Sequence, residues 1–556
     1  MSEFDPVFGL VRAGDHWHAR YWFPKASCVA IRTSHDIPLS RDGDLWVGRL
    51  DGPVERYRVI VDGVPRPDPF ARWLPDGVSG DPAPAVLPPL RPPKIRRPRS
   101  ELVILEVHVG TATPEGIFRA LIDQLPRYRD LGITALELLP VQQFGGDWGW
   151  GYDGVFWFAP HHAYGSPMEL AQLIDAAHQL ELSVFNDVVY NHLGPVGDPW
   201  WDTEFCRSDG QTDWGPTPDL RRPVVRDIIV ASVREWLEVY RFDGLRLDAV
   251  HCLRDDETPH LLTEIAQVAD GTLILENDAN ESNWLRQEGG YDSQWNDDFH
   301  NALHVAVTGE RDHYYRDFVD SPLVHLGRCL TEGFAYQGEH SAHRDRNRGS
   351  DTVGLSPFAF VNFAQNHDQV GNRGHGDRLI VSHGEDAYWL MATVAWLAPG
   401  IPMLWMGEDT GTRNPFPFFG NYPAELARAV REGRLRGHAG LPGFDRSMPD
   451  PAAQETFLSA KLPGGAESAE HASRVRELLT IRREALAPRW AQMDVLAGGF
   501  EVDDSVLRVR WPVNVELLIN LSSAPVTAPA GTLIACSQRG ASPWVPPMTA
   551  RFTEVP

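Results

Sequence analysis

The sequence predicts an α/β fold, a (β/α)8 TIM barrel with an N-terminal β-sandwich domain and a small C-terminal β-domain. Strand-like and helix-like segments alternate from residue 100 to residue 487, which favours a parallel barrel over an open sheet. Several of the apolar runs also end in carboxylates, and a barrel builds its active site at the carboxyl ends of its strands. These clusters are Asp187–His192, Gly244–His251, Leu273–Asn277 and Gln365–Gln369.

The first segment reads as a small β-sandwich. Short β-like runs at residues 17–22, 27–32 and 57–61 are separated by turn residues such as Asp62-Gly63. We therefore predict an E-set or Ig-like domain over residues 1–85. Residues 86–99 are rich in proline and basic residues, a composition that is stiff and cannot join the centre of a sheet. We predict a solvated linker there rather than an anion site.

The predicted catalytic barrel covers residues 100–487. Its strands are expected at residues 102–109, 135–139, 182–189, 242–247, 272–275, 291–295, 358–363 and 401–405, and the run at 291–295 has the weakest pattern. Helical spacing occurs between strands, for example at residues 225–240. After a helix around residues 472–485, β-like runs at 506–511 and 515–521 predict a C-terminal β-domain over residues 488–556.

Composition excludes several classes of protein. A net charge of −25 argues against a nucleic-acid partner, because phosphates would be repelled. The five cysteines contain no Cys-x-x-Cys pair, so neither a zinc ribbon nor a disulfide framework is indicated. The sequence shows neither a signal peptide nor an apolar run of membrane-spanning length. We expect a cytoplasmic protein with no membrane partner.

The residues at the strand ends suggest acid–base chemistry on an acetal. Such hydrolysis at neutral pH needs one protonated and one ionised carboxyl group. Asp248 follows Arg246 by two residues on a strand, so both face the same side, and the guanidinium is expected to lower the pKa of Asp248. Glu276 ends an apolar strand, where desolvation is expected to raise its pKa. Asp368, beside His367, is expected to bind sugar hydroxyls.

The four clusters together resemble the signature regions of the α-amylase family of retaining glycosidases. Matched position by position, the resemblance implies that Asp248 is the nucleophile, Glu276 the acid/base and Asp368 the stabiliser of the transition state. It implies retention of configuration, with the two working carboxyl groups about 5–5.5 Å apart. Contacts with the nucleophile or the bound sugar are implied for Asp187, His192, Arg246, His251, His367 and Gln369.

Aromatic residues after the second strand are predicted to bind the sugar rings. Trp148, Trp150 and Tyr152 alternate with glycines in a loop-like segment. Sugar rings present apolar C–H faces that stack on such side chains. We favour this interpretation over core packing, and the resemblance implies that Tyr152 stacks beneath the sugar of the cleaved subsite.

Three stretches narrow the resemblance to members that hydrolyse the α-1,4 bond joining trehalose to a maltooligosyl chain. They are Glu106–Gly116, Gln294–His304 and Gln365–Arg373. This implies maltooligosyltrehalose as substrate, functional coupling to a maltooligosyltrehalose synthase, and acceptor-side roles for Asp297, Asp298 and His300. A cap on the following helix is an equally good interpretation of Asn296 and Asp297. The stretch Gly407–Thr410 departs from the expected Gly-Glu-Glu-aromatic pattern.

Two alternatives stay open at this point. A glucan branching enzyme or another transglycosylase of the family has the same three carboxylates. A noncatalytic glucan-binding protein on a decayed barrel is disfavoured, because Asp248, Glu276 and Asp368 are all present. We predict no cofactor and no metal, since an Asp-x-Asp-x-Asp-Gly calcium loop is not found in the sequence.

Overall fold

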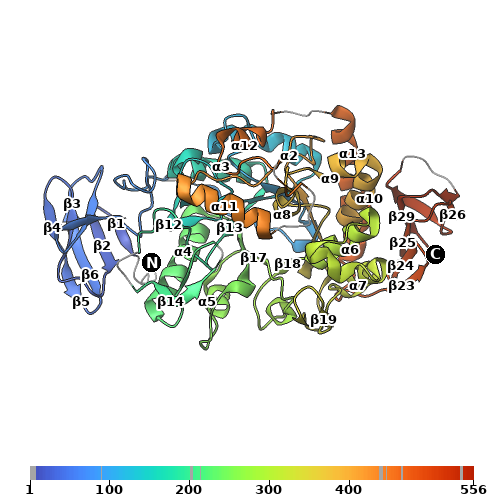
Figure 1. Cartoon of the computed structure of the whole chain (residues 1–556), viewed down its shortest axis with the longest axis horizontal. Coiled ribbons are helices and arrows are strands. Elements are labelled where there is room, and N and C mark those ends of the chain that lie inside the picture. Colours follow the sequence, from blue (N-terminus) through green and yellow to red (C-terminus); the bar gives the residue numbers. More distant parts are fainter. Residues whose placement is uncertain are drawn as a thin grey trace.

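The computed structural model describes residues 8–88, 91–200, 204–212, 214–437, 443–445, 447–464, 468–538 and 543–556. Residues 1–7 of the predicted sandwich and residues 89 and 90 of the predicted linker lie outside this part. The molecule is elongated, with N-terminal sheets at one end, the barrel in the middle and a C-terminal sheet at the other end (Figure 1). Within the described residues, no helix is both long enough and apolar enough to span a membrane.

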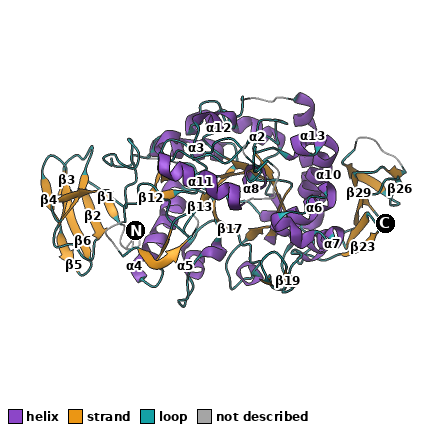
Figure 2. Cartoon of the chain, viewed as in Figure 1, coloured by secondary structure: helices purple, strands orange, loops and turns teal. Residues whose placement is uncertain are grey.

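Eight parallel strands close into a barrel, which confirms the predicted fold class. The first strand pairs with the last, with Ile104 opposite Met403, and the ring of strands is surrounded by helices (Figure 2). In barrel order the strands are β9 (Ile104–Val107), β10 (Ala135–Leu138), β13 (Ser183–Val188), β16 (Gly244–Leu247), β17 (Thr272–Leu275), β18 (Ser293–Trp295), β21 (Phe360–Phe363) and β22 (Ile401–Trp405). Each of the eight predicted runs contains one of these strands, including the weak run at residues 291–295.

The helices follow local sequence signals. Ser166 caps α3 by accepting the backbone N–H of Glu169, whose side chain in turn accepts the N–H of Ser166, and Pro167 occupies the first turn. The α-helices are α1 (Phe118–Ile122), α2 (Leu125–Leu131), α3 (Pro167–Gln179), α4 (Pro223–Arg234), α5 (Leu261–Val268), α6 (Asp297–Thr308), α7 (Pro322–Glu332), α8 (His367–Gly371), α9 (Leu379–Ser382), α10 (Gly384–Leu397), α11 (Ala424–Gly437), α12 (Gln454–Ser459), α13 (Ala469–Ile481) and α14 (Ala487–Trp490).

The N-terminal strands form two antiparallel sheets. One contains β1 (Gly9–Ala13), β2 (His16–Trp22), β6 (Leu45–Asp51) and β5 (Ser40–Asp42); the other contains β4 (Asp36–Pro38), β3 (Val29–Arg32), β7 (Arg58–Val61) and β8 (Val64–Arg66). Phe70, just after these strands, is fully buried and packs edge-on against Phe158 and Trp200. Arg72 donates to Glu235 at 3.0 Å, so apolar packing and an ion pair both join this region to the barrel.

The basic stretch that follows is bonded to the barrel. Arg91 donates to Asp175 at 2.8 Å, and the backbone N–H of Ile95 donates to Asp243 at 2.6 Å. Lys94 and Arg99 bond backbone carbonyl oxygens of the barrel region. The expectation of a solvated linker was therefore wrong for these residues. Their side chains bond carboxylates and backbone carbonyls of the barrel region, which composition alone does not reveal.

The C-terminal strands form a five-stranded antiparallel sheet in the order β23 (Gly499–Asp503), β24 (Val506–Trp511), β25 (Val515–Asn520), β29 (Thr549–Glu554) and β27 (Thr532–Cys536). The indole N–H of Trp511 donates to the carbonyl of Leu330 in α7 at 3.0 Å. The remaining strand pairs are β11 (Gln142–Phe144) with β12 (Gly154–Pro160), β14 (Cys206–Gln211) with β15 (Pro216–Pro218), β19 (His340–Ser341) with β20 (Arg346–Asn347), and β26 (Val526–Thr527) with β28 (Trp544–Val545).

Candidate active site

The barrel register brings the predicted carboxylates together. Asp187 of β13 lies opposite Arg246 of β16. The N–H of Asp248 donates to Val188 and that of Glu276 donates to Leu247, both at 3.0 Å, so the two residues extend neighbouring strands at the same end of the barrel. Parallel strands present their carboxyl ends at one rim. These pairings join segments that are far apart in the sequence, so the order of strands in the barrel decides them.

Arg246 is the centre of this cluster. Its Nη1 donates to Asp187 at 2.8 Å and to Asp248 at 2.8 Å, and its Nη2 donates to Glu276 at 3.0 Å. The side chain is fully buried, and its guanidinium lies over the ring of Trp295, 4.0 Å from the centroid. A planar guanidinium offers several donors in a fixed geometry, so one residue orients three carboxylates.

The pKa order of the two main carboxyls differs from the sequence expectation. Burial raises the pKa of Asp248 well above its ordinary value, and the charge of Glu276 adds to this. Burial also acts to raise the pKa of Glu276, but Arg246, His251 and the N–H of Ala249 outweigh it and leave the pKa below its ordinary value. The expected order was thus wrong for this side-chain arrangement. Arg246 serves both carboxylates, and Ala249 gives Glu276 a further donor.

Ala249 is a contributor that sequence reasoning missed. Its φ of 40° lies in the left-handed region, which is uncommon for a residue with a Cβ. In this conformation its N–H donates to Glu276 at 2.9 Å. Backbone strain of this kind concentrates at functional sites. The sequence gives no signal for it, because alanine has no preference for the left-handed region.

His367 and Asp368 follow β21 in the short helix α8. Nδ1 of His367 donates to Glu106 at 2.5 Å, and its backbone N–H donates to the same carboxylate at 3.0 Å. Burial acts to lower the pKa of His367, but the charges of Asp368 and Glu106 outweigh it and raise the pKa to about 9. His367 is therefore an imidazolium near neutral pH, with Nε2 3.5 Å from Asp368.

Two carboxyls inside the barrel were not among the predicted site residues. Glu106 holds His367, and its register partner on β10 is Glu137. Burial raises the pKa of Glu137 well above its ordinary value. A carboxylate within an otherwise apolar strand, as in Ile104–Val107, is the sequence signal that points to both.

Tyr152 and His192 lie beside the central cluster. Tyr152 donates its hydroxyl to Asp187 at 2.7 Å and stacks on His367 with ring centroids 5.0 Å apart. Burial raises the pKa of Asp187 to about 6, against the opposing charge of Arg246. His192 donates from Nε2 to the carbonyl of Tyr152 at 3.1 Å. Burial lowers the pKa of His192 to about 4, so it is neutral.

The two predicted sugar-binding tryptophans pack into the protein. Trp150 is 6% exposed, stacks on Phe416 and donates its indole N–H to Pro417 at 3.3 Å. Trp148 is half-buried and stacks on Phe457. The sugar-stacking prediction was wrong for Trp150, whose ring faces are covered by neighbours. An exposed ring near His192 belongs instead to Trp214, which is 54% exposed.

The residues predicted to bind the acceptor side of the substrate lie at the start of α6, and the structure places them in different surroundings. Asn296 caps the helix by accepting the N–H of Phe299, which confirms the capping interpretation for that residue. Burial raises the pKa of Asp297 well above its ordinary value, and the charges of Glu276, Asp278 and Asp368 act in the same direction. Asp297 therefore lies within electrostatic range of Glu276 and Asp368.

Asp298 and His300 point into the protein, and their predicted contact with substrate was wrong. Asp298 is fully buried; it accepts from Asn280, from the N–H groups of Ala335 and Tyr336, and from Arg348. His300 donates from Nδ1 to the carbonyl of Ala364 at 2.9 Å and contacts the hydroxyl of Tyr315 at 3.2 Å. Both carboxylate oxygens of Asp298 and both ring nitrogens of His300 thus form hydrogen bonds within the protein.

The two remaining candidates lie at the margin of the cluster. His251 accepts the N–H of Asp278 on Nδ1 at 3.2 Å. Gln369 is half-buried, and its Oε1 accepts the N–H of Asn366 at 3.0 Å to complete a capping box on α8. The structure thus assigns Gln369 a local role in holding the turn that carries Asp368.

Comparison with known proteins identifies the family. The family model described as the catalytic domain of α-amylase matches residues 67–215. A malto-oligosyltrehalose trehalohydrolase of Deinococcus radiodurans is 38% identical over 515 residues, which cover 88% of this chain and 84% of that protein. One of Rhizobium sp. strain M-11 is 39% identical over 521 residues, 87% of this chain and 86% of that protein. The chain belongs to the malto-oligosyltrehalose trehalohydrolase family.

Structural comparison agrees with this membership. A crystal structure of a Salmonella typhimurium protein described as an α-amylase superimposes with a TM-score of 0.92 and 36% identity, covering 99% of this chain and 100% of that one. A glucan branching enzyme of Streptomyces coelicolor is 37% identical, but over only 157 residues, 26% of this chain and 21% of that protein. The similarity to the trehalohydrolase family extends over far more of the chain.

The stretch Gly407–Thr410 after β22, which departs from the pattern expected for the family, is buried. Glu408 is buried, accepting from Gln365 at 3.1 Å and from the N–H of Trp405 at 2.8 Å. Burial raises its pKa to about 7. Asp409 is buried and pairs with Arg127. The departure at Asp409 therefore affects an internal ion pair and not a surface that a substrate contacts.

Proposed function

We propose that the chain hydrolyses the α-1,4 glycosidic bond between trehalose and the maltooligosyl chain of maltooligosyltrehalose, releasing free trehalose. The convergence of Asp187, Asp248 and Glu276 on the single guanidinium of Arg246 supports this most directly. Such a set of carboxyl groups at the rim of a barrel suits a retaining glycoside hydrolase. The names of the relatives, which match over most of this chain, support the choice of substrate.

The proposed reaction has two displacements. Asp248 attacks the anomeric carbon while Glu276 gives a proton to the oxygen of the leaving trehalose, and a covalent glycosyl-enzyme forms. Glu276 then takes a proton from water, which attacks the same carbon and frees Asp248. For this chemistry the carboxyl separation is predicted to be about 5–5.5 Å.

The proton must reside on Glu276 when the bond breaks, whereas the side-chain arrangement described above favours Asp248. Bound substrate acts on this balance in two ways. The glycosidic oxygen accepts a hydrogen bond only from a protonated Glu276, and the oxocarbenium-like transition state stabilises an ionised Asp248. The two groups titrate as a pair, so substrate binding moves one shared proton to the productive position.

Other residues support the sugar. We propose that Asp368 and the imidazolium of His367 bind hydroxyl groups of the reacting glucose, and that Tyr152 lies against its ring. Asp297 lies on the acceptor side, where a carboxyl accepts hydroxyl protons of the trehalose unit. A cytoplasmic location and functional coupling to a maltooligosyltrehalose synthase belong to the same proposal, since another enzyme must make the trehalose-ended chain.

Product analysis with maltotriosyltrehalose beside maltopentaose tests the proposal. We expect free trehalose from the first substrate and slow attack on the second, because the trehalose unit supplies acceptor-side binding energy that a maltose unit lacks. Equal cleavage of both would place the chain among general α-glucan hydrolases. New branch points in longer glucans would favour the branching enzyme instead.

A further inference from the structure

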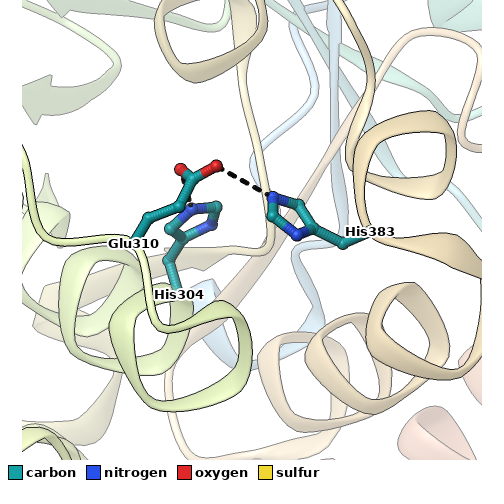
Figure 3. A group of neighbouring side chains, drawn as sticks. All are labelled: His304, Glu310 and His383. Atoms are coloured by element: carbon teal, nitrogen blue, oxygen red, sulfur yellow. Dashed lines mark hydrogen bonds and ion pairs between the residues drawn. The ribbon is translucent and has the colours of Figure 1, made fainter. Parts of the chain in front are cut away.

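A cluster outside the proposed reaction centre joins three segments of the chain. Glu310 lies just after α6, between His304 of α6 and His383 at the end of α9, and both rings point at its carboxylate (Figure 3). His304 donates from Nε2 to one oxygen at 2.9 Å, and His383 donates from Nε2 to the other at 3.1 Å. Two imidazoles and a carboxylate at this spacing are a plausible ligand set for zinc.

Arg373 argues against a metal in this cluster. It donates to both oxygens of Glu310, at 3.2 and 2.5 Å, and places a positive charge beside the position that a cation would occupy. Burial acts to raise the pKa of Glu310, but hydrogen bonds from His304, His383 and Arg373 outweigh it and hold the pKa far below its ordinary value. Glu310 is thus a permanent anion, and each of its oxygens accepts two donors.

Asp368 lies between two residues, Ala364 and Arg373, that are bonded to α6 or to Glu310 just after it. Arg373 follows Asp368 by five residues, just beyond the end of α8. Four residues before Asp368, the carbonyl of Ala364 accepts from His300, which lies on α6 one turn before His304. The rings of His300 and His304 stack with centroids 5.3 Å apart. His300 of α6 therefore holds the segment from Ala364 to Arg373 at one end, and Glu310, just after α6, holds it at the other.

We propose that Glu310 is a positioning residue that acts through Arg373 to fix Asp368 at the reaction centre. This proposal rests on the proposed glycosidase function. The charge-assisted pair and His300 together hold the segment, and Asn372, next to Arg373, donates to Asp368 at 3.3 Å. Because α6 also carries Asp297 in its first turn, the same helix couples the acceptor side of the site to Asp368.

The test is a double-mutant cycle. Glu310→Gln should lower kcat about 10- to 100-fold with KM changed less than about threefold, because a small displacement of Asp368 weakens the transition state more than the bound substrate. In an Asp368→Asn background, Glu310→Gln should lower kcat by less than about threefold, since its effect passes through Asp368. Arg373→Lys keeps the charge but loses the bidentate contact with Glu310, so it should also lower kcat, by a smaller factor.

A matched ion pair provides the control. Arg72 and Glu235 are about as buried as Arg373 and Glu310, and they join the N-terminal region to the barrel. Glu235→Gln and Arg72→Lys should lower the Tm as much as the cluster variants while kcat stays within about twofold. All variants are measured on whichever α-1,4 glucan the wild type cleaves, so failure of the trehalose assignment leaves this test intact.

Three results would overturn the proposal. The first is a Glu310→Gln enzyme with unchanged kcat; the second is an equal loss from that change with and without Asp368. The third is an activity of the wild type that falls with a chelator and returns with zinc, which would make the cluster a metal site.

Discussion

Arg246 donates to three carboxylates from a fully buried position, so its geometry decides how Asp187, Asp248 and Glu276 face each other. Burial of so many charges is unfavourable unless each has a partner. Here burial, together with the neighbouring charge of Glu276, raises the pKa of Asp248. The same crowding that makes the cluster costly keeps one proton within the pair, which acid–base chemistry requires.

Replacement of the proposed acid tests the assignment of roles. Glu276→Gln should lower kcat on the natural bond by about 100- to 10,000-fold, because the leaving oxygen receives no proton. A substrate with an activated leaving group, such as a maltosyl fluoride, should lose far less in its glycosylation step. Rates on the two substrates are the measurement, and Asp248→Asn, expected to remove both activities, is the control. Equal losses on both substrates would exclude Glu276 as the acid.

The ion pair of His367 with Glu106 predicts an alkaline limit. Because the pKa of His367 is raised to about 9, the stabilisation from its charge is complete below its ordinary value of 6.5 and is lost as pH rises through about 9. Glu106→Gln removes one of the charges that raise this pKa. The alkaline limb of the kcat/KM profile should then move to lower pH. An unshifted limb, measured between about pH 5 and about pH 10, would separate His367 from the activity.

Helix α6 carries two adjacent acids, Asp297 and Asp298, whose surroundings differ. The turn of the helix sends Asp298 into a fully buried network with Arg348. Asp297 instead lies where the charges of Glu276, Asp278 and Asp368 act on it. A helical repeat of 3.6 residues guarantees that neighbours face differently. Which acid faces inward depends on the packing of α6 against the segment at residues 333–348.

The two acids should respond oppositely to neutralisation. Asp298→Asn should lower the free energy of unfolding by about 3–5 kcal/mol, since Arg348 would stay buried without its partner. Asp297→Asn should not lower it, because a raised pKa means that folding disfavours the ionised form; it should raise KM for a trehalose-ended substrate. Denaturant titration and steady-state kinetics of both variants measure this. A stable Asp298→Asn enzyme with a raised KM would restore Asp298 to the substrate side.

At the scale of the whole molecule, the N-terminal sheets are fastened to the barrel by a small aromatic contact. Phe70 is fully buried and contacts Phe8 and Tyr21 of the N-terminal region as well as Phe158 and Trp200. Phe70→Ala should lower the free energy of unfolding by about 3–5 kcal/mol, because a large buried ring leaves a cavity. The kcat should stay close to that of the wild type. A large loss of kcat at intact stability would show that the sheets act on the site.

The order of strands and helices, the barrel, and the positions of Asp187, Arg246, Asp248, Glu276 and Asp368 at strand ends were predictable from the sequence. Each depends on local periodicity or on residues at the end of one strand, and such signals occur within a short stretch of the sequence. The match of four clusters to one family added the chemistry.

Tertiary structure alone decided how these residues are partnered. Glu106 bonds His367 across 261 positions in sequence, and Arg246 is shared among three carboxylates. Burial and these neighbours shift the pKa values of Asp248 and Glu276 in directions opposite to those expected from the sequence. The inward faces of Trp150, Asp298 and His300 were likewise set by neighbours remote in sequence. Burial and charge are sums over all groups nearby in space, so no stretch of sequence contains them.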